Sequence, residues 1–236
     1  PPMRLMLCLA AVVLLSLVGC PGSDPDGTCD PTAPALSTER LTLNGGRLID
    51  ARGREVLLRG VNTGGRAKLP PFHPFPFAES SRPEQADAEP FETAVETYFD
   101  RPAAWGLNVV RMPFSWEALE PERGTWNETY LARYEAMVDA AAARGMRVIV
   151  DFHQDVFARP YCGDGFPIWA VPEPVPEVPD SCFNWFMGYF SDASMKGAWD
   201  RFWANEDQLM DGFEAMWTMM ATRLWERPGV IGFEII

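Results

Sequence analysis

The residues best suited to chemistry follow two predicted strands and comprise an arginine, a histidine and an aspartate. Arg111 lies at the end of the apolar run 107–112, and His153 and Asp155 directly follow the apolar run 147–152. The fixed fork of donors on an arginine is suited to holding a carboxylate in its charged form. Because the carboxyl ends of parallel strands gather at one edge of a sheet, these side chains predict a polar site at that edge.

Neither a metal nor a nucleotide cofactor is expected at this site. The sequence has two histidines, His73 and His153, and five cysteines without a C-x-x-C pair. One histidine with two nearby carboxylates, Asp151 and Asp155, is not a convincing ligand set. No glycine-rich phosphate-binding motif follows a predicted strand, so the usual signal for nucleotide binding is missing.

The elements that must position these residues alternate between strands and helices. Turn signals at 44–46 and 51–53 separate short N-terminal strands, which predict a β-hairpin. Helical spacing follows, with one helix capped by Asn127 and stopped by Gly145. A long insertion at 155–205 precedes the last helix. Buried-type strands are predicted at 56–58, 107–112, 147–152 and 230–236, and helices at 92–105, 128–144 and 209–224. This order indicates a parallel α/β fold but leaves open a doubly wound sheet or a β/α barrel.

The N-terminus has the features of an export signal. Arg4 precedes an apolar segment, 5–18, that is too short to span a bilayer as a stable helix. The segment ends Leu-Val-Gly-Cys at Cys20, which resembles the lipobox of bacterial lipoproteins. We therefore expect residues 1–19 to be a signal peptide and Cys20 to carry lipid that holds the protein on a membrane. The alternative is an ordinary secretory signal cleaved nearby.

The segment 20–40 is rich in Pro, Gly, Ser, Thr and Asp and is expected to be a flexible tether before a folded part at 41–236. Export to an oxidising compartment favours a disulfide between Cys162 and Cys182. These cysteines bracket a loop rich in Pro and Gly. The alternative is two unpaired buried thiols, and Cys29 has no obvious partner.

The composition excludes some classes of protein. The 236 residues contain 20 Lys and Arg against 33 Asp and Glu, which gives a net charge of −13. Nucleic acid is not an expected partner, because a phosphate backbone selects clustered positive charge. With 47% hydrophobic residues, the chain has ample material for a core, and intrinsic disorder is not expected.

Four stretches together resemble glycoside hydrolase family 5, and within it the endoglycoceramidase-like members. The resemblance covers roughly residues 41–236, and its motifs fall in order on the four predicted strands. The most specific stretch is His-Gln-Asp at 153–155 with the Gly-Asp-Gly that follows. The four stretches are 58–62 with 64–68, 106–113 with Trp116, 151–155 with 162–165 and 167–170, and 230–236.

The resemblance implies a (β/α)8 TIM barrel that hydrolyses glycosidic bonds with retention, using two glutamates. In the family the acid/base lies in an Asn-Glu-Pro after strand four, and the nucleophile lies on strand seven. The sequence ends at Ile236, ahead of both positions. We therefore expect about the first four β/α units plus the hairpin, without either catalytic glutamate and inactive alone. Glu234 is expected to be a paired residue within a strand rather than the acid/base.

The resemblance also gives roles to four polar residues. Arg111 is expected to support the nucleophile, or else to form a structural salt bridge at the barrel rim. His153 is expected to bind substrate or orient the acid/base region, with a purely structural role as the alternative. Asp155 and Lys68 are expected to contact the glycan, and solvated loop charges are the alternative for both.

Two tryptophans are candidates for stacking on sugar rings. Trp116 and Trp203 flank predicted helices, where tryptophan also commonly belongs to the core. Both are candidates to stack on pyranose rings of a bound substrate, and core packing is the more common environment for a tryptophan at such positions.

The sequence thus predicts an exported, lipid-anchored retaining endo-β-glycosidase of the cell envelope. The expected substrate is the linkage between glycan and ceramide in a glycolipid. Two alternatives remain open. One is an endo-β-1,4-glucanase or mannanase of the same family, and the other is a non-catalytic, lipid-anchored carbohydrate-binding protein.

Overall fold

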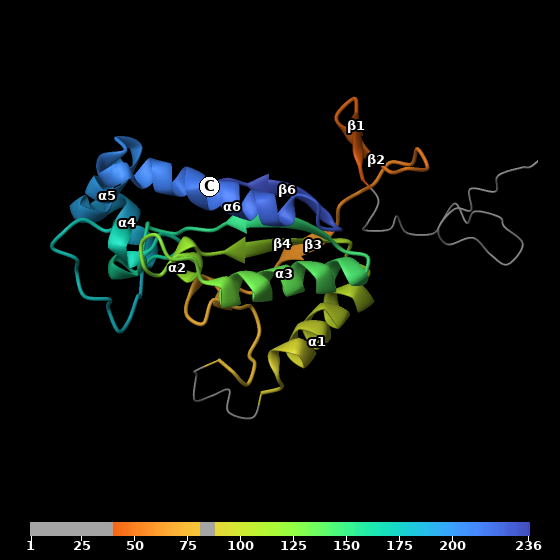
Figure 1. The fold of residues 1–236 in the computed structure, drawn as a ribbon, viewed down its shortest axis with the longest axis horizontal. Coiled ribbons are helices and arrows are strands. Elements are labelled where there is room, and N and C mark those ends of the chain that lie inside the picture. Colours follow the sequence, from red (N-terminus) through yellow and green to blue (C-terminus); the bar gives the residue numbers. More distant parts are fainter. Residues whose placement is uncertain (1–39, 81–87) are drawn as a thin grey trace, which may run out of the picture. The chain divides into compact units, whose positions relative to one another are not determined.

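The computed structural model describes residues 40–80 and 88–236 (Figure 1). The expected signal peptide, Cys20 and Cys29 lie outside the described residues. The predicted hairpin is present as strands β1 (Thr42–Asn44) and β2 (Arg47–Ile49), which pair antiparallel. Gly45 and Gly46 form its turn with φ of +56° and +80°, a backbone conformation that glycine adopts without steric cost.

The main sheet has four parallel strands whose spatial order follows the chain. These strands are β3 (Gly60–Asn62), β4 (Val109–Phe114), β5 (Arg147–Phe152) and β6 (Val230–Glu234). Each crossover therefore steps in the same direction around the sheet. A doubly wound sheet reverses direction at a switch point, whereas a β/α barrel does not. The sequence pattern left open a doubly wound sheet or a β/α barrel, and the strand order favours the barrel.

Helices connect successive strands or sit in the loops that follow them. Figure 1 shows α2, α4 and α5 beyond the arrowheads of β4 and β5. The long helices that link the strands are α1 (Phe91–Ala104), α3 (Glu128–Ala143) and α6 (Leu209–Leu224). The helices in the loops are α2 (Trp116–Leu119), α4 (Gly188–Ser191) and α5 (Ala193–Trp203). Short 3₁₀ segments are Gly65–Lys68, Arg159–Tyr161, Ile168–Ala170, Trp185–Met187 and Glu206–Gln208.

The two faces of the sheet differ in character. Side chains on alternate positions of a strand point to opposite faces, and those that face the helices are apolar and buried. Phe114 packs against Tyr134 of α3 and Trp217 of α6 with ring centroids 5.9 and 5.3 Å apart. The opposite face carries Arg111 and Glu234, both only partly buried. The buried apolar face holds Val110, Met112, Phe114, Val148, Val150 and Phe152.

Three strand predictions were wrong in their bounds, and one of them, 230–236, ends two residues early as β6. Residues 56–58 form no strand, and Leu57 is 72% exposed. The side chain of Asn108 accepts a hydrogen bond from the Arg59 N–H at 2.7 Å and donates one to the Leu57 carbonyl at 2.8 Å. These bonds occupy backbone groups just before the strand, so pairing begins at Gly60 opposite Val109.

A further difference concerns the strand predicted at 107–112, which is observed as β4 two residues later. Arg111 is therefore the third of six residues in β4 and not its end. Its side chain must reach toward the carboxyl ends of the neighbouring strands. The strand predicted at 147–152 and the helix predicted at 209–224 are confirmed with the same bounds.

The insertion after β5 contains α4 and α5, and a disulfide ahead of these helices closes a loop within it. Cys162 and Cys182 are bonded, with Cα atoms 5.3 Å apart, so the expected pairing is present. Within residues 40–80 and 88–236, no helix combines the length and the sustained apolarity needed to cross a bilayer.

The predicted N-cap of α3 is confirmed. Asn127 Oδ1 accepts a hydrogen bond from the Tyr130 N–H at 3.0 Å, and Asn127 Nδ2 donates to the Ala118 carbonyl at 3.1 Å. The same side chain therefore satisfies a free N–H of the first turn and fixes α2 to the start of α3.

We predict that Asn127→Ala in the full-length protein lowers the free energy of unfolding by about 1 kcal/mol, because the first turn of α3 loses its cap. Urea titration monitored by circular dichroism measures this change. Asn127→Asp is the matched variant, since it keeps the capping acceptor and loses only the donor to Ala118. Equal stability of Asn127→Ala and the wild type would contradict the prediction.

Candidate active site

An arginine links three neighbouring strands at the polar face of the sheet. Arg111 Nε donates to Glu234 Oε2 at 2.6 Å, and Arg111 Nη2 donates to Glu234 Oε1 at 2.9 Å and to Asp151 Oδ1 at 2.9 Å. The register places Pro113 of β4, Asp151 of β5 and Glu234 of β6 in one row. Arg111 lies two residues before Pro113, so its long side chain extends up to both carboxylates.

The charges of this group stabilise one another. The hydrogen bond from Arg111 lowers the pKa of Glu234, and the same bond raises the pKa of Arg111. Glu234 is therefore a paired carboxylate, as the sequence predicted. A general acid must carry a proton near the working pH, and a carboxyl with a lowered pKa does not. This geometry agrees with the prediction that Glu234 is not the acid/base.

His153 follows β5 and lies between two aspartates. Its Nδ1 is 3.3 Å from Asp151 Oδ2, and its Nε2 is 3.3 Å from Asp155 Oδ2. The interactions with Asp151 first and Asp155 second raise the pKa of His153 to about 9, although burial acts in the opposite direction. The imidazole is therefore positively charged at neutral pH. Asp151 is fully buried and joins Arg111 to His153.

Lys68 and Asp155 meet although 87 positions separate them in the sequence. The 3₁₀ segment Gly65–Lys68 follows β3 and brings Lys68 Nζ to 2.5 Å from Asp155 Oδ2. Burial works to raise the pKa of Asp155, and the hydrogen bonds from His153 and Lys68 outweigh it, so the pKa is lowered. The side chains of Lys68 and Asp155 remain 30% and 21% exposed, which leaves both accessible to a ligand.

The backbone after Asp155 is held in an unusual conformation. Val156 has φ of +40° and Phe157 has φ of +73°, values that are costly for a β-branched or bulky side chain. The Val156 N–H donates to the Tyr189 hydroxyl at 2.9 Å, which helps to hold the segment in place. Strain of this kind concentrates where function requires a fixed geometry, and here it sets the direction of Asp155.

The two tryptophans predicted to stack on sugars behave differently. Trp116 is fully buried, and its indole Nε1 donates to Glu120 Oε2 at 2.6 Å. It packs against Phe166, Trp169 and Phe213. The stacking prediction for Trp116 was wrong, because no face of its ring is free for a ligand.

Trp203 is 62% exposed at the end of α5 and stacks on Trp199, with ring centroids 6.1 Å apart. Among the described residues, no contact joins Trp203 to Lys68, Asp155 or Arg111. A role for Trp203 in sugar binding stays a prediction.

Sequence reasoning gave no role to Asp164, which the structure brings to the same site. One ligand atom from each of His153, Asp155 and Asp164 lies within 4.8 Å of the other two. The available signal was the pair of glycines on either side of Asp164, because glycine permits close approach of two backbones.

These three residues are an unfavourable set for a metal ion. A histidine ligand must be neutral, whereas His153 carries a proton at neutral pH. The ammonium of Lys68 already neutralises Asp155. The expectation of a site without metal stays a prediction.

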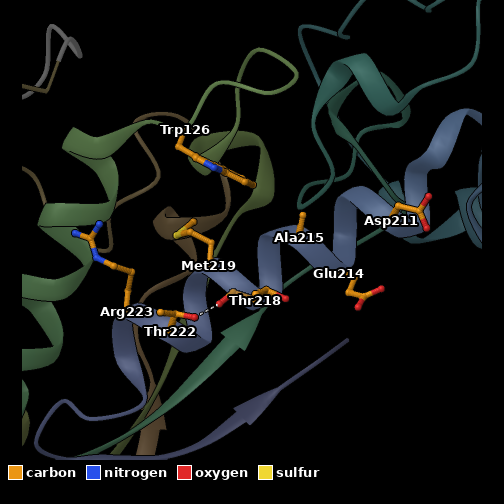
Figure 2. Close-up of a pocket in the computed structure, with 8 residues that line it drawn as sticks. All are labelled: Trp126, Asp211, Glu214, Ala215, Thr218, Met219, Thr222 and Arg223. Carbon is orange, nitrogen blue, oxygen red and sulfur yellow. Dashed lines mark hydrogen bonds between the residues drawn. The ribbon is translucent and has the colours of Figure 1, made fainter.

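A separate groove of about 550 Å³ lies along α6. Figure 2 shows its lining, with Trp126 on one side and Glu214, Thr218 and Arg223 of α6 on the other. None of its lining residues belongs to the group around Arg111 and His153. This groove therefore plays no part in the candidate active site.

The two histidines of this chain allow a direct test of the electrostatics. Burial lowers the pKa of His73 to about 4, and carboxylates raise that of His153 to about 9. We predict that His73 and His153 titrate with well-separated midpoints in NMR spectra of the full-length protein labelled at histidine, and His73→Gln and His153→Gln assign the two signals.

The raised pKa of His153 also makes a signed contribution to stability. The pKa of His153 exceeds the ordinary value of about 6.5. The charged imidazole therefore contributes its full stabilisation of the fold below about pH 6.5, and this stabilisation is lost as the pH rises through about 9. Asp151→Asn should move the His153 midpoint down toward the ordinary value and leave His73 unchanged. A His153 midpoint that Asp151→Asn does not move would contradict the assignment.

Comparisons with known proteins show the family to which the chain belongs. Residues 49–236 match the cellulase family, glycosyl hydrolase family 5. Endoglycoceramidase I of Rhodococcus hoagii is 34% identical over 209 residues, which cover 86% of this chain and 37% of that protein. An endoglycoceramidase of Cyanea nozakii is 31% identical over 212 residues, which cover 80% of this chain and 39% of that protein.

The solved structures agree with the sequence relatives. Endo-glycoceramidase II from Rhodococcus sp., described as a lactosyl-enzyme intermediate, superposes with a TM-score of 0.63 and 28% identity over 80% of this chain and 42% of that one. The chain thus spans about two fifths of the length of these relatives. Their fold is the (β/α)8 TIM barrel, and the described residues contain four of its parallel strands. Its matching region, its strand order and its relatives all place this chain in the cellulase family, glycosyl hydrolase family 5.

Proposed function

We propose that the full-length protein is a retaining endo-β-glycosidase that hydrolyses the linkage between glycan and ceramide in glycolipids. The observation that carries the proposal is the group formed by Lys68, Asp155 and His153 near the carboxyl ends of the parallel strands, together with family membership. In barrel enzymes the active site lies at this end of the strands.

This group has the donors and acceptors that a sugar requires. A sugar hydroxyl both donates and accepts hydrogen bonds, and Asp155 offers carboxylate oxygens beside the ammonium of Lys68. Charged partners make hydrogen bonds roughly twice as strong as neutral ones. The partial exposure of Lys68 and Asp155 lets a glycan hydroxyl reach both charged groups at once.

The reaction uses two glutamates that the family places after the strand containing Glu234. One protonates the leaving oxygen and the other forms a glycosyl-enzyme, which water then resolves; this requires carboxyl groups about 5–5.5 Å apart. Arg111 contributes positive charge at the polar face of the sheet. A cation near a nucleophilic carboxylate favours the ionised form that the first step needs.

An apolar segment beside the site supports a substrate with a lipid portion. Residues 183–190 contain no charged side chain, and Phe183 and Phe190 are 90% and 72% exposed. Tyr189 of the same segment accepts the hydrogen bond from Val156, the residue after Asp155. The apolar segment is thus fixed directly to the proposed glycan-binding loop. Relatives named endoglycoceramidase, and one neighbour described as a ganglioside GM3 complex, agree with such a substrate.

Two other functions have specific support. The matching family is named for cellulases, which favours an endo-β-1,4-glucanase or mannanase as the second candidate. A non-catalytic, lipid-anchored carbohydrate-binding protein is the third, because Lys68 and Asp155 are suited to binding a sugar without any reaction.

We predict that the full-length protein releases an intact oligosaccharide from a glycosphingolipid and turns over carboxymethylcellulose far more slowly. Asp155→Ala should lower kcat/KM for the glycolipid by about 10- to 100-fold, because a charged hydrogen bond to substrate is worth about 1.5–3 kcal/mol. Chromatography of the released glycan gives the rates. Glu214→Ala, an acidic residue on the outer groove of α6, is the control and should have the wild-type rate.

The outcome separates the three functions. Turnover of carboxymethylcellulose without turnover of the glycolipid would show that the substrate is a glucan. Tight glycolipid binding without release of any sugar would show that the protein binds glycolipids but does not hydrolyse them. Loss of activity in Glu214→Ala equal to that in Asp155→Ala would remove the argument for the Lys68–Asp155 pair.

The protein is further proposed to be an exported bacterial lipoprotein of the cell envelope, anchored through Cys20. The support is the lipobox-like sequence that ends at Cys20. A membrane anchor would hold the enzyme near a lipid substrate, and two or more acyl chains suffice for stable attachment.

We predict that a host with a lipoprotein pathway incorporates labelled palmitate into the full-length protein and that Cys20→Ser abolishes this incorporation. The variant should move from the membrane fraction to the soluble fraction. Cys29→Ser is the matched control and should stay on the membrane. Equal labelling of the wild type and Cys20→Ser would exclude lipidation at this cysteine.

A further inference from the structure

Two glycines bring Asp164 against the segment that holds His153 and Asp155. The Asp164 N–H donates to the Asp155 carbonyl at 2.9 Å. A Cβ on Gly163 would lie 1.9 Å from that same carbonyl oxygen, and a Cβ on Gly165 would lie 2.6 Å from the His153 carbonyl oxygen. Only glycine permits this approach, so the sequence Gly-Asp-Gly fixes Asp164 beside the proposed sugar-binding group.

The carboxyl of Asp164 is buried, and one of its oxygens has no hydrogen-bond partner among the described residues. The residue is 6% exposed, and the oxygen without a partner is Oδ1. Leaving a charged carboxylate oxygen buried without a partner is costly, whereas a neutral carboxyl is tolerated far better. The geometry therefore favours a protonated Asp164.

The surrounding charges favour the same state. Lys68, Arg111 and His153 are positive and balance three carboxylates, Asp151, Asp155 and Glu234. An ionised Asp164 would add a negative charge that no cation of this group balances.

The groups that face Asp164 act on its pKa in both directions. Burial is the largest influence, and with repulsion from Asp155 and Asp151 it raises the pKa to about 7, against the attraction of Lys68 and His153. On the other side of the loop, the Gly165 carbonyl accepts the Glu117 N–H at 3.0 Å. The carboxylate of Glu117 is paired with Arg159 and adds no free charge there.

We propose that Asp164 is a positioning residue whose neutral form leaves Lys68 and Asp155 paired in the arrangement that binds sugar hydroxyls. The proposal rests on the proposed function and adds a determinant of substrate binding to it. When Asp164 ionises, it repels Asp155 and attracts the ammonium of Lys68. The pair that contacts the glycan then opens, and affinity for the sugar falls.

The protonation state is measured without any reference to activity. Infrared difference spectra of the full-length protein should contain the carbonyl band of a protonated carboxylic acid that disappears with a midpoint near pH 7. Asp164→Asn should remove the contribution of Asp164 and leave that of the downstream acid/base glutamate, and Asp155→Asn, the matched control, should keep both. A band of unchanged intensity in Asp164→Asn, or no protonated-acid band in the wild type, overturns the proposal.

The effect on binding is measured with lactose as the probe, by calorimetry at pH 6 and pH 8. If lactose binds only when Asp164 is neutral, the fraction of protein able to bind it falls about tenfold between pH 6 and pH 8. The apparent affinity then falls by the same factor. The wild type should show this decrease. Asp164→Asn, which is neutral at both pH values, should bind equally well at both, and Asp164→Ala should bind weakly at both.

Each failure has its own signature. A wild type that hydrolyses glycolipid while Asp164→Asn keeps the full pH dependence overturns the role of Asp164 and leaves the proposed function intact. A wild type that neither binds lactose nor hydrolyses glycolipid overturns the proposed function and this role with it. Binding of Zn²⁺ that Asp164→Asn abolishes would identify a metal site instead. The wild-type titrations need no variant, so misfolding of a variant does not prevent a decision.

Discussion

The candidate site depends on the bonds of Arg111 to two carboxylates. These bonds join β4 to β5 and β6 on the face of the sheet opposite the helices. A guanidinium stays charged at any physiological pH, and its hydrogen bond lowers the pKa of Glu234. Asp151 in turn interacts with His153. The positions of the groups that face a ligand therefore follow from one arginine in the middle of a strand.

A division of the sheet into two faces makes this arrangement stable. The face toward α3 and α6 is aromatic and aliphatic, and its burial supplies most of the driving force for folding. On the other face, Arg111 and Glu234 are only partly buried, and the fully buried Asp151 is paired with Arg111, which limits the cost of keeping these groups charged. The chain thus separates the apolar residues that hold the sheet together from the charged residues of the candidate site.

The sequence predicted the elements whose signals are local. The strand at 147–152 and the helix at 209–224 agree with their patterns, because burial on one side determines both. The start of β3 was missed because a distant side chain, Asn108, holds the backbone before Gly60. Trp116 was assigned to the wrong environment because core and sugar-binding tryptophans look alike in sequence. Asp164 was overlooked because its importance depends on a close approach of two loops.

The disulfide makes the turn that carries Asp164 dependent on redox conditions. Cys162 directly precedes the Gly-Asp-Gly turn, and its bond to Cys182 anchors that turn to the insertion beyond it. In a reducing cytosol the two thiols would remain separate, and the turn would have one restraint fewer. The position of Asp164, which that turn carries, therefore depends on a bond that forms only under oxidising conditions.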